Sequence, residues 1–111
     1  MQSYRKLLQQ EIRLLTILIE KASITLPEDW QEKMIVCSMD DGHMGSLRLY
    51  PNGEVLNICL FEKQISECRF FDKDGVLVLA SLNLDREGNM FELDIWKTDY
   101  TPLINIPEQI D

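Results

Sequence analysis

The chain has 111 residues, of which 45% are apolar and 27% are charged, and this balance excludes a disordered chain, a collagen-like repeat and a disulfide scaffold. Its length predicts one domain spanning residues 1–111, with one hydrophobic core. Nineteen acidic against eleven basic side chains give a formal net charge of −8, so we expect no nucleic-acid and no membrane-surface partner, whereas a basic protein would be attracted.

The N-terminal stretch Ser3–Ala22 is predicted to form one helix, because its apolar residues recur at the three-and-four spacing of an amphipathic stripe. Ser3 is its expected N-cap. Glu11 falls near the centre of the stripe, where an ionised carboxylate must be paired or neutralised. Glu11 is either an acid or base of raised pKa in a pocket between helix and sheet, or it bends to the stripe edge or pairs with a sheet residue such as Arg48 or Arg69. The second interpretation is favoured.

The stretch after this helix changes from helical to strand-like spacing. Residues Pro27–Glu32 predict one further helical turn with proline at its start. The period of two that follows predicts strands at Lys33–Met39 and Ser46–Tyr50, and Val55–Phe61 is a further candidate strand.

Three clearer strand-like runs follow, at Ile65–Phe71, Val76–Leu84 and Met90–Thr98. The links between them, Asp72–Gly75 and Asp85–Gly88, share one turn chemistry, in which the first aspartate accepts from backbone N–H groups and the glycine supplies a left-handed residue. This pattern predicts an antiparallel meander. The loops fit two registers that differ by one residue, so the sequence does not determine which side chains of the last strand lie on which face.

In the first half of the middle strand, Val76–Leu84, the side chains that point to either face of the sheet are apolar, which predicts that both faces are covered. One helix covers only one face. The candidates for the other face are the 54–63 segment, the Pro102–Pro107 stretch or a second copy of the chain. We therefore predict an α+β fold in which the N-terminal helix packs on a mostly antiparallel sheet of four to six strands.

Cys37, Cys59 and Cys68 leave at least one thiol unpaired and lack C-x-x-C spacing, so they are interpreted as small buried thiols. Together with the absence of an apolar run near the ~20 residues of a bilayer crossing, this usage predicts a cytoplasmic protein.

The chain offers few residues for catalysis or metal binding. Asp40, Asp41 and His43 lack the converging geometry of a metal site and are interpreted as a turn with solvated acids. A single histidine and the lack of a Gly-x-Ser-x-Gly motif leave nothing on which to build a hydrolytic triad. We therefore expect no metal, no cofactor and no enzyme activity.

The strongest candidate site is the acidic and aromatic stretch that begins at Glu92. Alternation places Glu92, Asp94 and Trp96 on one strand face, with Asp99 and Tyr100 just beyond. Aromatic rings are rigid anchors for a protein partner, and carboxylates match arginine or lysine. The alternative is that Trp96 packs in the core or under the C-terminus while the acids are solvated.

Two stretches, Asp41–Leu47 (DGHMGSL) and Glu92–Leu103 (ELDIWKTDYTPL), resemble signatures of a family of small uncharacterised bacterial proteins. Phe71–Val76 and the leucine-rich N-terminal helix fit the same family, so the resemblance covers nearly the whole chain. His43 departs from it, because a second glycine is expected there. Proteins of this size and acidity also resemble the immunity proteins encoded beside polymorphic toxins. The resemblance implies an inhibitor's role and no catalytic residues.

The leading hypothesis is thus a non-enzymatic protein-binding domain, an immunity-type inhibitor whose acidic and aromatic surface occludes a basic toxin. Its expected partner-binding residues are Glu92, Asp94, Trp96 and Asp99. One alternative is a small enzyme or ligand-binding domain with a pocket around Glu11. Another is a homodimer whose interface is the second face of the sheet.

Overall fold

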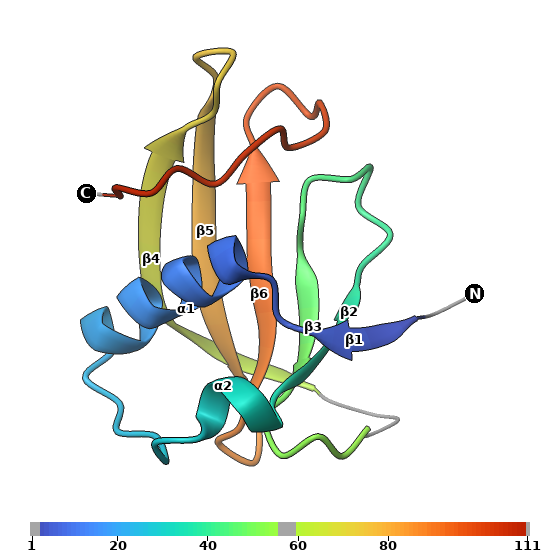
Figure 1. Ribbon diagram of the computed structural model, residues 1–111, viewed down its shortest axis with the longest axis vertical. Helices are drawn as coiled ribbons and strands as arrows, with labels where there is room; N and C mark the ends of the chain where they lie inside the picture. The colour runs from blue at the N-terminus through green and yellow to red at the C-terminus, as the bar shows by residue number, and fades with distance from the viewer. Residues whose placement is uncertain (1–2, 56–59, 111) are drawn as a thin grey trace.

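A computed structural model describes residues 3–55 and 60–110, whose strands form one antiparallel six-stranded sheet in the order β1-β2-β3-β6-β5-β4 (Figure 1). The strands are β1 (Tyr4–Lys6), β2 (Ile35–Ser38), β3 (Leu47–Tyr50), β4 (Phe61–Phe71), β5 (Leu77–Asp85) and β6 (Met90–Lys97), and the helices are α1 (Gln9–Lys21) and α2 (Trp30–Lys33). The prediction of an α+β fold with the N-terminal helix on an antiparallel sheet is confirmed.

The predicted meander is formed by β4, β5 and β6, and its turns use the expected chemistry. Asp85 Oδ1 accepts hydrogen bonds from the backbone N–H groups of Glu87 (3.0 Å) and Asn89 (2.9 Å). Gly75 and Gly88 have φ angles of +81° and +85°, which glycine adopts at little cost. The register that the sequence left open is now fixed by the pairing of β5 with β6.

The prediction of one helix from Ser3 is wrong at its beginning. Residues Tyr4–Lys6 form β1 at the edge of the sheet, and α1 begins only at Gln9. Ser3 is therefore not the N-cap, and Glu11 instead fixes the first turn by accepting a hydrogen bond from Leu8 N at 2.8 Å. The pairing of β1 with β2 joins segments about thirty residues apart, which local spacing does not reveal.

Two further boundaries differ from the sequence predictions. The turn expected at Pro27–Glu32 becomes helical only at Trp30, whose N–H donates to the carbonyl of Pro27 at 3.1 Å. Of the candidate strand Val55–Phe61, residues 56–59 lie outside the described residues, and Phe61 is the first residue of β4. The two preceding strands, β2 and β3, lie within their predicted ranges.

The core lies between α1 and one face of the sheet. The buried side chains of α1 are Glu11, Leu14, Leu15, Leu18 and Ile19. Their apolar members pack against Val36, Leu49, Val78, Ala80, Leu82, Leu93 and Ile95 of the strands. This face of the sheet, covered by α1, is called the helix face below.

The C-terminal segment after β6 also crosses the helix face, beside α1 (Figure 1). Ile106 is buried there, and its carbonyl accepts a hydrogen bond from Arg13 Nη2 at 3.0 Å. The Pro102–Pro107 stretch was one candidate to cover the opposite face of β5, and this placement removes it. Neither a helix nor the C-terminal segment, within the described residues, covers that opposite face, which is called the open face below.

The long edge strand β4 is bent. Its pairing with β5 is interrupted by register shifts between Phe61 and Lys63 and between Gln64 and Ser66. In Figure 1 its first half passes behind the lower ends of β5 and β6. At this end of the open face Asn83 is buried, whereas at the other end Phe71 and Trp96 are exposed and Leu77 and Leu79 are only half-buried. The prediction that both faces of Val76–Leu84 are covered is therefore wrong at that other end.

Cys37 and Cys68 are free and buried, as predicted. Burial raises the pKa of the Cys68 thiol. Cys59 lies outside the described residues. No helix in the described part of the chain is long and apolar enough to span a membrane.

Candidate functional site

The three predicted binding residues of β6 share the open face. Cross-strand pairing sets Trp96 opposite Leu79 and Asp94 opposite Ser81, which puts them on the side away from α1. Trp96 is 38% exposed, Asp94 is exposed and Glu92 is half-buried. The indole of Trp96 therefore does not pack in the core.

Further apolar side chains extend this surface around Trp96. The ring of Tyr100 lies 6.0 Å from the ring of Trp96, centroid to centroid, and is 70% exposed. Phe71 is 66% exposed and is paired with Leu77 on the same face. We call this set the aromatic patch: Phe71, Leu77, Leu79, Trp96 and Tyr100. Sequence reasoning did not select Phe71 as a binding residue, although the apolar residues on both sides of β5 predicted that this face is covered, by a segment of the chain or by a second copy.

Acidic side chains lie beside the aromatic patch. Glu67 of β4 and Asp94 of β6 are the two cross-strand neighbours of Ser81 and are both exposed. Asp99, in the turn after β6, accepts hydrogen bonds from the hydroxyl (2.6 Å) and the N–H (3.1 Å) of Thr101. These bonds lower the pKa of Asp99 and keep it charged. Arg69, opposite Leu79, is a basic side chain on the same face.

Glu92 differs from the other three predicted residues because its carboxylate already binds a side chain of the sheet. It accepts a hydrogen bond of 2.7 Å from Asn83 Nδ2 and faces Arg48 across the β3–β6 pair. The guanidinium of Arg48 lies 5.6 Å from the centre of the Phe91 ring. Asp94, Trp96 and Asp99 are thus the predicted residues with most contact to solvent.

A fully buried lysine lies behind this surface, and sequence reasoning missed it. Lys97 has 0% of its surface exposed. Its Nζ donates to Asp72 Oδ2 (2.9 Å), Asp74 Oδ2 (2.7 Å) and the Pro102 carbonyl (3.1 Å), so all three N–H groups have acceptors. Burial opposes the charge of Lys97, but the two carboxylates raise its pKa above the ordinary value. We call Lys97, Asp72 and Asp74 the lysine clasp.

Asp72 connects the clasp to the C-terminal segment. Its two oxygens also accept hydrogen bonds from the N–H groups of Ile104 (2.8 Å), Asn105 (3.0 Å) and Lys73 (2.7 Å). Burial would raise the pKa of Asp72, but these hydrogen bonds together with the one from Lys97 hold it below its ordinary value. The carboxylate therefore remains charged and joins three parts of the chain.

The lysine clasp also positions the candidate binding residues. The turn that carries Asp99 and Tyr100 is closed at both ends by Lys97: its carbonyl accepts from Tyr100 N at 2.8 Å, and its Nζ binds the carbonyl of Pro102. Tyr100 has a φ of +64°, an uncommon angle for a residue with a side chain. The clasp thus holds the Tyr100 ring near Trp96 before any partner binds.

The two stretches that carry the sequence resemblance are neighbours in space. Ser46 Oγ accepts from Ile95 N (2.8 Å) and donates to the Ile95 carbonyl (3.1 Å), and Leu103 N donates to the His43 carbonyl (2.9 Å). A Cβ at Gly45, where φ is +101°, would lie 3.0 Å from the side chain of Leu103. The positive φ favours glycine at this position, and a side chain there would also have to displace Leu103.

The loop that carries Asp40, Asp41 and His43 has the hydrogen bonds of a turn. The carboxylate of Asp41 accepts from Met44 N (3.1 Å) and Ser46 N (2.9 Å). Across residues 3–55 and 60–110, no group of three His, Cys, Asp or Glu side chains is arranged to hold a metal ion.

Glu11, the residue of the alternative hypothesis, is 6% exposed and has partners for both oxygens. Arg5 of β1 donates to Oε1 and to Oε2, each at 2.8 Å, in a bidentate ion pair, and Leu8 N also donates to Oε1. Its partner is therefore Arg5 and not Arg48 or Arg69. A structural role in joining β1 to α1 accounts for its position in the apolar stripe.

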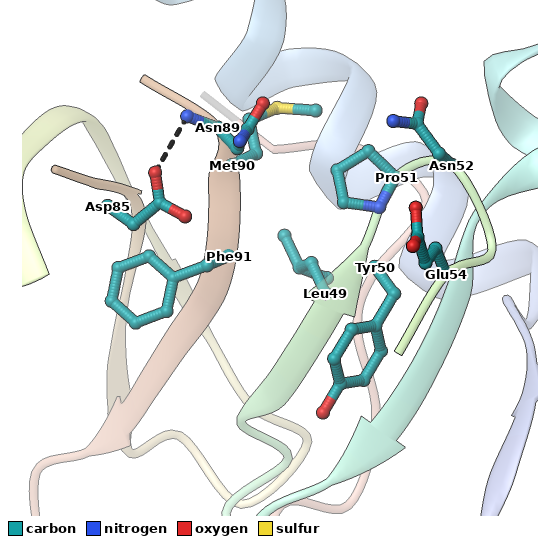
Figure 2. Close-up of a pocket in the computed structure, with 9 residues that line it drawn as sticks. All are labelled: Leu49, Tyr50, Pro51, Asn52, Glu54, Asp85, Asn89, Met90 and Phe91. Carbon is teal, nitrogen blue, oxygen red and sulfur yellow. Dashed lines mark hydrogen bonds between the residues drawn. The ribbon is translucent and has the colours of Figure 1, made fainter. Parts of the chain in front are cut away.

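Two adjoining cavities lie at the other end of the sheet from the aromatic patch. The smaller, of about 70 Å³, is shown in Figure 2, between Leu49 and Tyr50 of β3 and Met90 and Phe91 of β6. The larger, of about 360 Å³, lies on the α2 side. Pro51, Asn52, Asn89 and Met90 line both.

Comparison with family models gave a match over residues 4–107, to the model described as a domain of unknown function (DUF6984). The comparisons with curated proteins and with solved structures each found no match.

Proposed function

The chain belongs to this family of domains of unknown function, and we propose that it is a non-enzymatic protein-binding domain whose open face binds a basic protein. In its most specific form, it is a cytoplasmic immunity-type inhibitor that occludes a basic bacterial toxin. The observation that supports this proposal best is the gathering of Trp96, Tyr100 and Phe71 with Asp94 and Asp99 on and beside a face that α1 leaves open.

The chemistry of the surface suits a protein partner better than a small substrate. Tight interfaces place rigid aromatic side chains at their centre and charged groups toward their rim. The aromatic patch supplies the first, and Glu67, Asp94 and Asp99 supply the second. A net charge of −8 would accelerate encounter with a basic partner.

Affinity capture from the native host tests the proposal with three variants. Trp96→Ala removes the central ring, Asp94→Lys reverses a rim charge, and Glu28→Lys reverses an exposed charge outside the surface. We expect the wild type and Glu28→Lys to capture the same basic protein, Asp94→Lys to capture less, and Trp96→Ala to lose at least tenfold in affinity. Equal capture by all four proteins would contradict the proposal.

Co-expression tests the inhibitor role separately. If the captured protein is toxic, the wild-type chain should restore growth of cells that produce it, and Trp96→Ala should restore growth less well. A homodimer is the alternative occupant of the open face. Sedimentation that shows a dimer of the wild type and a monomer of Trp96→Ala would favour that alternative.

A further inference from the structure

The larger cavity is built from four segments at the α2 end of the molecule: the link between α1 and α2, α2 itself, the turn after β3, and the turn between β5 and β6 (Figure 1). Its volume of about 360 Å³ lies within the range of small-ligand sites. Its apolar lining consists of Ile24, Leu26, Trp30, Met34, Leu84 and Met90.

The walls of the cavity are held in place without a ligand. Gly53 N donates to the Tyr50 carbonyl at 2.9 Å, and Gly88 N donates to the Asp85 carbonyl at 3.1 Å, so both turns are closed. A Cβ at Gly53, where φ is +74°, would lie 3.1 Å from the carbonyl oxygen of Lys33, so the turn after β3 packs directly on the end of α2. Because these walls are already ordered, little conformational entropy is lost when a ligand binds between them.

The cavity continues into a gap in the sheet. The β3–β6 ladder contains only the pairs Leu47 with Leu93 and Arg48 with Glu92, and beyond them the two strands diverge. The smaller cavity of Figure 2 occupies this divergence. The sheet therefore leaves, beside an apolar cavity, a stretch where the two strands do not complete their ladder.

The polar lining indicates the chemistry of the ligand. The carboxamides of Asn52 and Asn89 both donate and accept hydrogen bonds. Asp29 and Lys33 pair with each other at 3.5 Å, so the charges in the lining of the larger cavity cancel, and the smaller cavity adds only the acidic Glu54 and Asp85. A net charge of −8 further disfavours an anion.

From the apolar lining, the preformed walls and the uncharged polar groups, we infer that this cavity binds an uncharged amphipathic small molecule, with an apolar body and one hydrogen-bonding head. The inference is independent of the proposed protein-binding surface, which lies at the other end of the sheet.

Straight-chain alcohols from hexanol to dodecanol are the probe, and methionine methyl NMR is the measurement. Met34 and Met90 line the cavity, whereas Met39 and Met44 do not and serve as internal controls. We expect saturable shifts of the first pair alone. Affinity should rise about three- to fourfold per added methylene until the cavity is full. Decanoate should bind more weakly than decanol. Absence of saturable shifts, or equal shifts of all four methyls, would overturn the inference.

A filling variant tests the location. Leu26→Trp places a larger side chain in the cavity, and Leu79→Trp makes the same change on the open face. With circular dichroism confirming that each folds, we expect Leu26→Trp to weaken decanol binding more than tenfold and Leu79→Trp to leave it unchanged. Unchanged binding by a folded Leu26→Trp would refute this site. If Leu26→Trp does not fold, the location is tested by the wild type alone, through the shifts of Met34 and Met90 compared with those of Met39 and Met44.

Discussion

At the scale of single residues, the buried lysine clasp is the feature that most directly links stability to the candidate site. Asp72 accepts from Lys97 and from the N–H groups of Ile104 and Asn105, so one carboxylate fixes both the end of β6 and the C-terminal segment. Asp85 occupies the same position in the other turn of the meander, but its carboxylate accepts hydrogen bonds from Glu87 and Asn89 of that same turn.

The two turn aspartates form a matched pair for mutagenesis. We expect Asp72→Asn to lower the free energy of unfolding by about 3 kcal/mol, because it removes one of the two carboxylates that balance a buried charge. Asp85→Asn should cost only about 1 kcal/mol, the usual value of a hydrogen bond. Urea unfolding at pH 7 measures both. Equal losses would show that the clasp adds nothing to ordinary turn chemistry.

The clasp also predicts how stability depends on pH. Because the pKa of Asp72 is lower in the folded protein than its ordinary value of 3.8, its contribution is complete above pH 3.8 and is lost as the pH falls below that value. The pKa of Lys97 is raised above 10.5, so its contribution is complete below pH 10.5 and is lost as the pH rises through the folded value. Urea unfolding between pH 5 and pH 2 should give a shallower loss for Asp72→Asn than for the wild type.

At the scale of elements, the junction between β1 and α1 depends on one ion pair. Glu11 closes the first turn of α1 through Leu8 N and binds Arg5 of β1 with both oxygens. The same side chain thus begins the helix and holds the edge strand against the sheet. A carboxylate in an apolar stripe is here a connector between two elements.

The connector can be tested against a second glutamate of the same helix. Glu11→Ala should lower the free energy of unfolding by about 2 kcal/mol, since hydrogen bonds to a charged group are lost and Arg5 loses its partner. Glu20→Ala, at an exposed position of α1, should change it by less than about 0.5 kcal/mol. Both values come from urea unfolding. If Glu11→Ala lowers the free energy of unfolding no more than Glu20→Ala does, Glu11 does not join β1 to α1 as described.

Elements set by local chemistry were predictable from the sequence, and those set by distant contacts were not. The meander followed from alternation and from two Asp-to-Gly turns. Residues Tyr4–Lys6 were assigned to the helix because their spacing fits it, whereas their pairing with β2 is a tertiary contact. Lys97 was missed because its face depends on the register, and the sequence left the register open. Trp96 and Asp94 were selected correctly as one face, but not as the open face.

At the scale of the whole molecule, the two candidate sites occupy opposite ends of the sheet. The aromatic patch lies where β5 and β6 meet the C-terminal segment, and the apolar cavity lies at the α2 end. α1 and the C-terminal segment cover one face (Figure 1), and the proposed binding surface lies on the opposite face, around Leu79 and Trp96. On the proposed function, the partner covers Leu77 and Leu79, the apolar side chains that β5 places on the open face.

The negative charge of the molecule predicts the salt dependence of binding. Association with the captured basic partner should slow as sodium chloride rises from 50 to 500 mM, because screening weakens attraction between exposed charges. Asp94→Lys should slow association and flatten this dependence, whereas Trp96→Ala should act mainly on dissociation. Surface plasmon resonance separates the two rates. An association rate independent of salt would contradict an electrostatic role for the acids.

The footprint of the captured partner on the chain tests the central claim most directly. Backbone amide NMR of the labelled chain, with and without the partner, should show its largest shifts at Leu79, Asp94, Trp96 and Tyr100, with small shifts along α1. Shifts concentrated on α1 and on residues 102–110, with the open face unchanged, would contradict the account.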